Sequence, residues 1–85
     1  MTIPRVISTD AVNFGSIITR LRVKRGYTKA KLAQRAGISS QYVAIVEQGL
    51  NVPSLKTVLD LLEVLEADGG EVFRELLTTR NTATQ

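Results

Sequence analysis

Residues 28–49 read TKAKLAQRAGISSQYVAIVEQG, and this stretch decides the fold. Thr28 has a side chain suited to capping a helix, whose predicted body is the eight residues that follow. Gly37 adopts positive φ at low cost, which a sharp turn between two helices commonly requires. Ser39 is a suitable cap for a second helix. The stretch therefore predicts two short helices joined by a tight turn.

The second of these helices presents a small polar tip and no catalytic group. Val43 and Val46 lie three residues apart and are expected to face the core. The outward positions are Ser40, Gln41, Ala44 and Ile45. Two short helices joined in this way have the layout of a helix-turn-helix motif, in which the second helix enters the DNA major groove and the first lies across the backbone.

Apolar residues at helical spacing predict another helix before the motif. It starts at Asp10 or Asn13, either of which has a capping side chain, and ends at Gly26. Its apolar residues recur at i, i+3, i+4 and i+7, and they are Phe14, Ile17, Ile18 and Leu21.

After the motif, Pro53 and Ser54 start a fourth predicted helix. Its main apolar stripe consists of Leu55, Val58, Leu59, Leu62 and Leu65. Leu61 and Val64 spill onto a second stripe, which needs another cover, either a fifth helix or a second subunit. The fifth helix is predicted over residues 71–78, and its apolar residues are Val72, Phe73, Leu76 and Leu77.

The ends of the chain lack this periodicity. Residues 1–9 contain Pro4 and scattered apolar residues, and we interpret them as an arm that is either disordered or a short strand against a partner subunit. Residues 80–85 form a polar tail that we expect to be frayed. The domain therefore spans residues 10–79, and the fold class is all-α, a compact bundle of four to five helices.

The composition excludes most catalytic chemistry. The 85 residues include neither histidine nor cysteine, the commonest general base, metal ligand and thiol nucleophile. We therefore expect neither an enzyme nor a metal site or cofactor. The sequence also lacks an apolar run of the roughly 20 residues that span a membrane, and its first residues lack the apolar core of a signal peptide. A cytoplasmic protein is the expectation.

Charge is distributed unevenly along the chain. Residues 1–41 hold eight Lys and Arg side chains against one acid, whereas residues 42–85 hold three against seven. This pattern is expected if the side that carries the first two helices meets phosphate. The alternative is a basic face that is merely solvated.

Over residues 14–65 the sequence resembles the lambda-repressor and Cro-like (Xre-type) helix-turn-helix proteins. The matching positions are Leu21, Arg22, Gly26, Thr28, Leu32, Ala33, Gly37, Ile38, Ser39, Tyr42, Val43, Glu47, Gly49, Pro53 and Ser54. The resemblance implies a bundle that binds double-stranded operator DNA as a symmetric homodimer. The chain resembles in particular small stand-alone regulators of similar size, including restriction-modification controller proteins and antitoxins.

The resemblance also implies roles for individual residues. Thr28 and Lys29 match positions that contact phosphate, as Tyr42 does, and the start of the second motif helix matches positions that touch base edges. Gln41 is the one residue there that can bond adenine bidentately, so it is the expected base reader. The full DNA-binding set is Thr28, Lys29, Ser39, Ser40, Gln41, Tyr42, Ala44, Ile45 and Asn51.

Two further positions follow from the same resemblance. Arg22 and Glu47 match a pair that bridges the first and third helices in relatives, which predicts a mostly buried salt bridge; the alternative is that both are solvated. Ile45 departs from the basic or polar residue common at its position. It either reads thymine methyl groups together with Ala44 or packs against the protein.

These observations predict a sequence-specific transcriptional regulator. Its dimer interface is expected on the fourth and fifth helices, at Leu61, Val64, Leu65, Val72, Phe73 and Leu76. The alternatives are an antitoxin that binds its own promoter and a toxin partner, and a helix-turn-helix domain used only for protein contacts.

Overall fold

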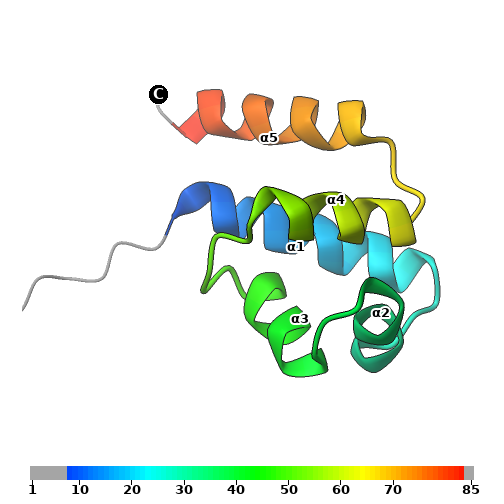
Figure 1. Ribbon diagram of the computed structural model, residues 1–85. Coiled ribbons are helices and arrows are strands. Elements are labelled where there is room, and N and C mark those ends of the chain that lie inside the picture. Colours follow the sequence, from blue (N-terminus) through cyan, green and yellow to red (C-terminus); the bar gives the residue numbers. More distant parts are fainter. Residues whose placement is uncertain (1–7, 84–85) are drawn as a thin grey trace, which may run out of the picture.

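Five α-helices make up the described part of the chain in the computed structural model, which describes residues 8–83 and their side chains as far as Arg80. They are α1 (Thr9–Lys24), α2 (Lys29–Ala36), α3 (Ser40–Glu47), α4 (Leu55–Val64) and α5 (Gly69–Ala83). Figure 1 shows α2 and α3 on one side of α1 and α4, with α5 on the other. The predicted all-α bundle is confirmed.

Hydroxyl side chains cap the first four helices. The Oγ1 of Thr28 accepts a hydrogen bond from the backbone N–H of Lys31, and the Oγ of Ser39 accepts one from Tyr42, both at 3.0 Å. These two caps were predicted. The predicted start of α1 was wrong, because Ser8 caps the helix by accepting from Ala11. The helix therefore begins before both predicted caps.

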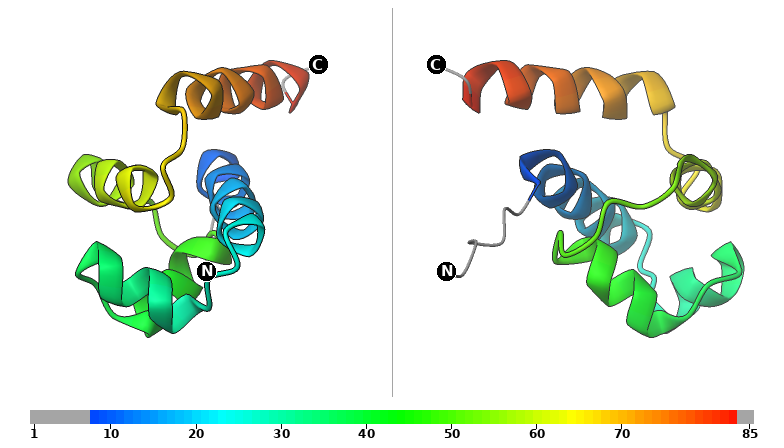
Figure 2. Two further views of the ribbon diagram at one scale, coloured as in Figure 1. Left: turned by 90° about the vertical axis from the view of Figure 1, so that its right-hand side faces the viewer. Right: turned by 60° about the vertical axis from the view of Figure 1, so that its left-hand side comes forward.

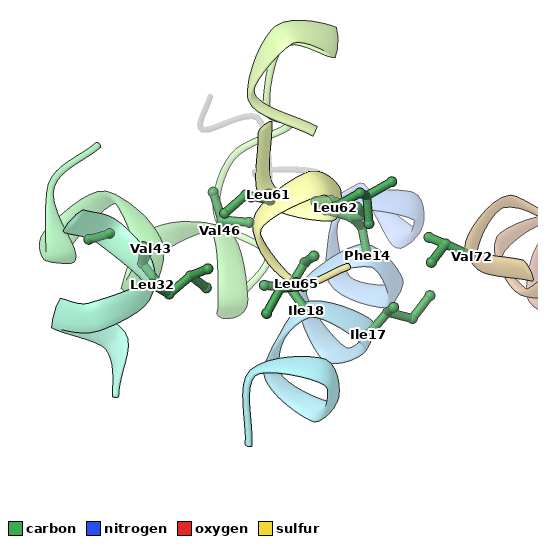
Figure 3. Close-up of a cluster of buried hydrophobic side chains, with 11 residues drawn as sticks. Phe14, Ile17, Ile18, Leu32, Val43, Val46, Leu61, Leu62, Leu65 and Val72 are labelled. Carbon is green, nitrogen blue, oxygen red and sulfur yellow. The ribbon is translucent and has the colours of Figure 1, made fainter. Parts of the chain in front are cut away.

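The core is formed by side chains from all five helices (Figure 3). Its buried members are Phe14, Ile17, Ile18, Leu32, Ala33, Val43, Val46, Leu61, Leu62, Leu65 and Val72. The inward positions predicted for α3, Val43 and Val46, are each 1% exposed. Among the side chains described up to Arg80, Val72 is the one buried member from α5, and Leu76 packs partly against the core.

The predicted packing stripe of α4 was partly wrong. Leu61, Leu62 and Leu65 are buried, whereas Leu55 and Leu59 are 68% and 54% exposed. Apolar residues occupy so many positions of this helix that two neighbouring stripes satisfy the 3.6-residue period. The bundle packs the stripe that contains Leu61 and leaves Leu55 and Leu59 on the surface.

Helix α5 is longer than predicted and lies as a separate layer over α1 and α4 (Figure 2). It begins at Gly69, where the Oδ1 of Asp68 accepts from the backbone N–H of Glu71 at 3.2 Å. It continues through Ala83, so the first residues of the predicted tail are helical. Residues 1–7 of the predicted arm lie outside the described residues.

Helices α1 and α3 approach each other closely at Gly15. A Cβ atom built there would lie 2.4 Å from the carbonyl oxygen of Val46 and 2.6 Å from that of Glu47. No side chain larger than hydrogen fits unless the two helices separate. This contact fixes α3 against α1, so the exposed side of α3 has a defined position on the molecule.

Candidate nucleic-acid interface

The turn between α2 and α3 is tightly specified by its residues. Gly37 has φ 72°, in the left-handed region, and the backbone N–H of Ile38 donates to the carbonyl of Ala33 at 3.0 Å. Ile38 packs partly against the core, and Ser39 then caps α3. A left-handed glycine, an anchored apolar side chain and a helix cap thus hold the two motif helices at one angle.

Most candidate DNA-binding side chains are open to solvent. The exposed members of the predicted set are Thr28, Lys29, Ser39, Ser40, Gln41 and Asn51, and the half-buried ones are Tyr42, Ala44 and Ile45. Exposed residues therefore cluster at the starts of α2 and α3, which Figure 1 shows on the side of the molecule away from α5. Backbone and side-chain donors at such helix starts are suited to phosphate.

The outer side of α3 offers one flexible amide and little else that is polar. Gln41 is exposed in the first turn, where a recognition helix contacts base edges. Ala44 and Ile45 are half-buried, so protein covers part of each side chain. A thymine methyl group would meet only the remaining, exposed part of each side chain.

Arg22 and Glu47 form the predicted ion pair between α1 and α3. The Nε of Arg22 lies 2.7 Å from Oε2 of Glu47, and Nη2 lies 3.2 Å from Oε1. The third nitrogen, Nη1, donates to the carbonyl of Tyr27 at 2.8 Å. The side chains are 13% and 5% exposed, so the pair is mostly buried. It joins α1, the α1–α2 turn and α3 at one point.

Ion pairing reduces the positive charge available to phosphate below what the sequence suggested. Three of the basic side chains in residues 1–41 pair with acids of the second half: Arg20 with Glu75, Arg22 with Glu47 and Arg25 with Glu66. Within the described residues, no ion pair involves Lys29 or Lys31, which are exposed at the start of α2. Lys29 and Lys31 at the start of α2 and Arg35 near its end, which lies over the Tyr27 ring, therefore form the basic surface of the motif.

Charged groups join α5 to α1 at two places on the surface. Arg20 forms a two-pronged pair with Glu75 at 2.8 and 3.0 Å, and Arg80 pairs with Asp10. The hydrogen bond from Arg20 lowers the pKa of Glu75, and the hydrogen bond from Arg80 lowers the pKa of Asp10. Both pairs are exposed, so water and salt screen them and each contributes little to stability.

The predicted dimer interface needs correction. Leu61, Leu65 and Val72 are 0%, 2% and 5% exposed inside a single chain, so their side chains cannot meet a partner. Val64 and Leu76 are half-buried, and Phe73 is 44% exposed.

Apart from Phe73, which was in the predicted interface, sequence reasoning missed the exposed apolar side chains on α4, on α5 and in the loop before α4. We define the α4–α5 apolar face as Val52, Leu55, Leu59, Phe73 and Leu77, which are 44–68% exposed. Two hollows of about 140 and 280 Å³ lie beside it, and Phe73 and Leu76 line both. A surface of this composition indicates a site for protein contact. The only sequence signal for it was the excess of apolar residues on α4 and α5.

No helix among residues 8–83 is long and apolar enough to cross a membrane.

The model of the helix-turn-helix domain family matches residues 13–76. Two bacterial sequences described as uncharacterized HTH-type transcriptional regulators are similar. YgzD of Bacillus subtilis (strain 168) is 34% identical over 56 residues, which are 66% of this chain and 85% of YgzD. The y4dJ protein of Sinorhizobium fredii is 35% identical over 51 residues, 60% of this chain and 66% of y4dJ.

Solved structures share the architecture. The restriction-modification controller protein C.AhdI from Aeromonas hydrophila superposes with a TM-score of 0.72 at 32% identity, covering 76% of this chain and 98% of C.AhdI. The clp gene regulator ClgR from C. glutamicum superposes with a TM-score of 0.77 at 21% identity, covering 85% of this chain and 94% of that chain. At that lower identity, the likeness to ClgR establishes the fold alone.

Proposed function

This chain belongs to the helix-turn-helix domain family of DNA-binding transcriptional regulators, and we propose that it acts as a homodimer on two half-sites of one operator. The observation that carries the proposal is the exposed start of α3, with Gln41 in its first turn, held against α1 by the pair of Arg22 and Glu47. A base-reading helix has to be presented rigidly, because a small displacement loses its hydrogen bonds to base edges.

Affinity and specificity come from different residues in this proposal. Lys29 supplies charge to a phosphate, and Thr28 and Tyr42 supply hydrogen-bonding groups beside it. Gln41 reads a base pair, with a bidentate bond to adenine as the expected contact. Ser40 and Ala44 contribute weaker contacts to the same half-site.

Dimerisation is proposed through the α4–α5 apolar face. Covering Leu55, Leu59, Phe73 and Leu77 with the same residues of a second copy removes from water side chains that the monomer leaves about half exposed or more. A two-fold axis through this face gives two recognition helices, which fit half-sites about one turn of DNA apart. The bound dimer then blocks or recruits polymerase.

The restriction-modification controller protein C.AhdI, with a similar structure, is a regulator of comparable size. By analogy we propose for this chain an operator near a gene that it regulates. A toxin that occupies the α4–α5 apolar face is the alternative partner. Sedimentation of the purified chain separates the two: a dimer at micromolar concentration supports self-association, and a monomer supports a different partner.

Matched glutamine variants test the reading role. Gln41→Ala should weaken binding at the cognate site by about 1–3 kcal/mol and change binding to unrelated DNA little. Gln48→Ala removes an equivalent exposed amide at the other end of α3. It should leave the affinity for the cognate site and for unrelated DNA unchanged. Equal losses for Gln41→Ala on all DNA would rule out a reading role.

A salt titration tests the phosphate role separately. The logarithm of affinity falls with the logarithm of salt concentration by about 0.9 for each phosphate neutralised, so Lys29→Ala, which removes two contacts from a dimer, should reduce the slope by about 1.8. The control is Lys56→Ala on α4, because the ammonium of Lys56 pairs with Asp60 in the wild type. An unchanged slope for Lys29→Ala would exclude that lysine from the interface.

A further inference from the structure

The last turn of α1 reaches across to the turn between α4 and α5. Arg25 follows α1 directly, and its Nε donates to the carbonyl of Leu65 at 2.9 Å. Its Nη1 lies 3.0 Å from Oε2 of Glu66. Leu65 is the C-cap residue of α4, where carbonyl groups lack partners within the helix. One guanidinium thus holds both the end of α4 and the residue after it.

Glu66 stands where a helix end usually has glycine. Its φ is 51°, and among the described residues no other side chain apart from glycine has positive φ. The backbone N–H of Ala67 donates to the carbonyl of Leu62 at 2.9 Å, which closes α4 through a left-handed cap. Glutamate is more strained than glycine in this left-handed conformation, but its side chain forms the ion pair with Arg25.

At the start of α5, Val72 is buried in the core, and Ala67 just before the helix packs partly against it. A hollow of about 430 Å³ lies between the end of α1, the α4–α5 turn and the first turn of α5, and Leu21, Lys24 and Glu71 are among its lining residues. Arg25 bridges this hollow. Farther along α5, the charged attachments are the two exposed pairs with α1.

We propose that Arg25 is a positioning residue that sets the spacing of the two half-sites, an inference that rests on the proposed homodimer. Arg22 joins α3 to α1, and Arg25, three residues later, joins α1 to the turn from which α5 starts. The recognition helix α3 and the turn before α5, which supplies Phe73 and Leu77 to the proposed dimer face, are therefore both bonded to the end of α1. A change in the direction of α5 changes the distance between the two recognition helices.

The lever is long enough to matter on the scale of a base pair. With recognition helices about 34 Å apart, each lies about 17 Å from the two-fold axis. A rotation of about 10° at the α4–α5 turn displaces a point about 17 Å from that turn by about 3 Å, close to the roughly 3.4 Å rise of one base pair. If α5 could rotate freely at this turn, the dimer would bind pairs of half-sites at several spacings.

The test measures affinity for duplexes in which two copies of the selected half-site are separated by a spacer that is lengthened or shortened one base pair at a time. The wild type should prefer one spacing by about tenfold or more, because a wrong spacing forces DNA deformation. Arg25→Ala should reduce that preference by about threefold or more, or move the optimum by one base pair. Arg25→Lys should do the same, because one ammonium cannot reproduce the planar fork.

Lys24→Ala is the matched control, since it removes a positive charge one residue away and from the same hollow. It should change affinity equally at all spacings. If Arg25→Ala does not fold, as judged by its melting curve, Arg25→Lys decides the question. A spacing profile identical to wild type in a folded Arg25 variant would overturn the positioning role. A wild type with no preference between one and two half-sites would instead overturn the proposed homodimer.

Discussion

Replacing Glu47 with glutamine should lower the free energy of unfolding by more than the exchange of one carboxylate oxygen for an NH2 group suggests. The substitution keeps the size and shape of the side chain but removes the negative charge between α1 and α3. Arg22 remains, only 13% exposed, with two of its nitrogens facing an amide in place of a carboxylate. Its third nitrogen still donates to Tyr27, so the guanidinium cannot easily turn to water.

The expected loss is large relative to the stability of the domain. Breaking a buried pair by removing one partner costs about 3–5 kcal/mol, because a charge is left uncompensated. A chain of 85 residues has a free energy of unfolding of about 4–13 kcal/mol. A loss of 3 kcal/mol lowers the Tm of a domain of this size by about 12–24 °C.

Urea unfolding followed by circular dichroism at one fixed protein concentration measures this loss, since dimerisation makes stability depend on concentration. Glu63→Gln, at an exposed position of α4, is the control and should change the free energy of unfolding by less than about 0.5 kcal/mol. A loss below about 1 kcal/mol for Glu47→Gln would refute the reasoning that this pair is buried and joins the two helices.

Three further outcomes are expected. Gly15→Ala should lower the free energy of unfolding by about 1–3 kcal/mol, since its Cβ would lie 2.4 Å from the carbonyl oxygen of Val46; calorimetry measures this. Leu77→Lys should make the protein monomeric in sedimentation without lowering its helix content, because the side chain is 57% exposed in the monomer. The hydrogen bond from Arg20 lowers the pKa of Glu75, so the stability from this pair is present above the ordinary carboxylate pKa and is lost as pH falls below about 4. The gap in Tm between wild type and Glu75→Gln should therefore close in acid.

Each of these outcomes has a clear opposite. A stable Gly15→Ala protein would mean that α1 and α3 have room between them. A dimer that survives Leu77→Lys would place self-association elsewhere, and a Tm gap for Glu75→Gln that persists unchanged at about pH 2 would mean that its charge does not hold α5.

The helix-turn-helix was predictable because its signals are local. Thr28, Gly37 and Ser39 each act on the backbone within a few residues, so their types predict the helix starts and the turn directly. The buried pair of Arg22 and Glu47 was also predictable, but only through resemblance to a family, since nothing local joins residues 25 positions apart.

The α4–α5 apolar face was predicted less well, because its residues depend on which side of each helix packs. Apolar residues cover so much of α4 that the sequence allows two stripes, and tertiary packing chose the one with Leu61. The contact of Arg25 with the carbonyl of Leu65 left no pattern in the sequence at all, since its acceptor is backbone. Contacts of this kind become visible only when the fold brings distant turns together.

Selection of bound duplexes from random DNA, with the wild type and with Gln41→Ala, tests the central claim most directly. The wild type should enrich inverted half-sites whose centres lie about 10–10.5 base pairs apart. Gln41→Ala should keep that arrangement and lose its preference at one base pair of each half-site. Wild-type protein that enriches no sequence at low salt, or a Gln41→Ala protein that selects the same bases at every position, would contradict this account.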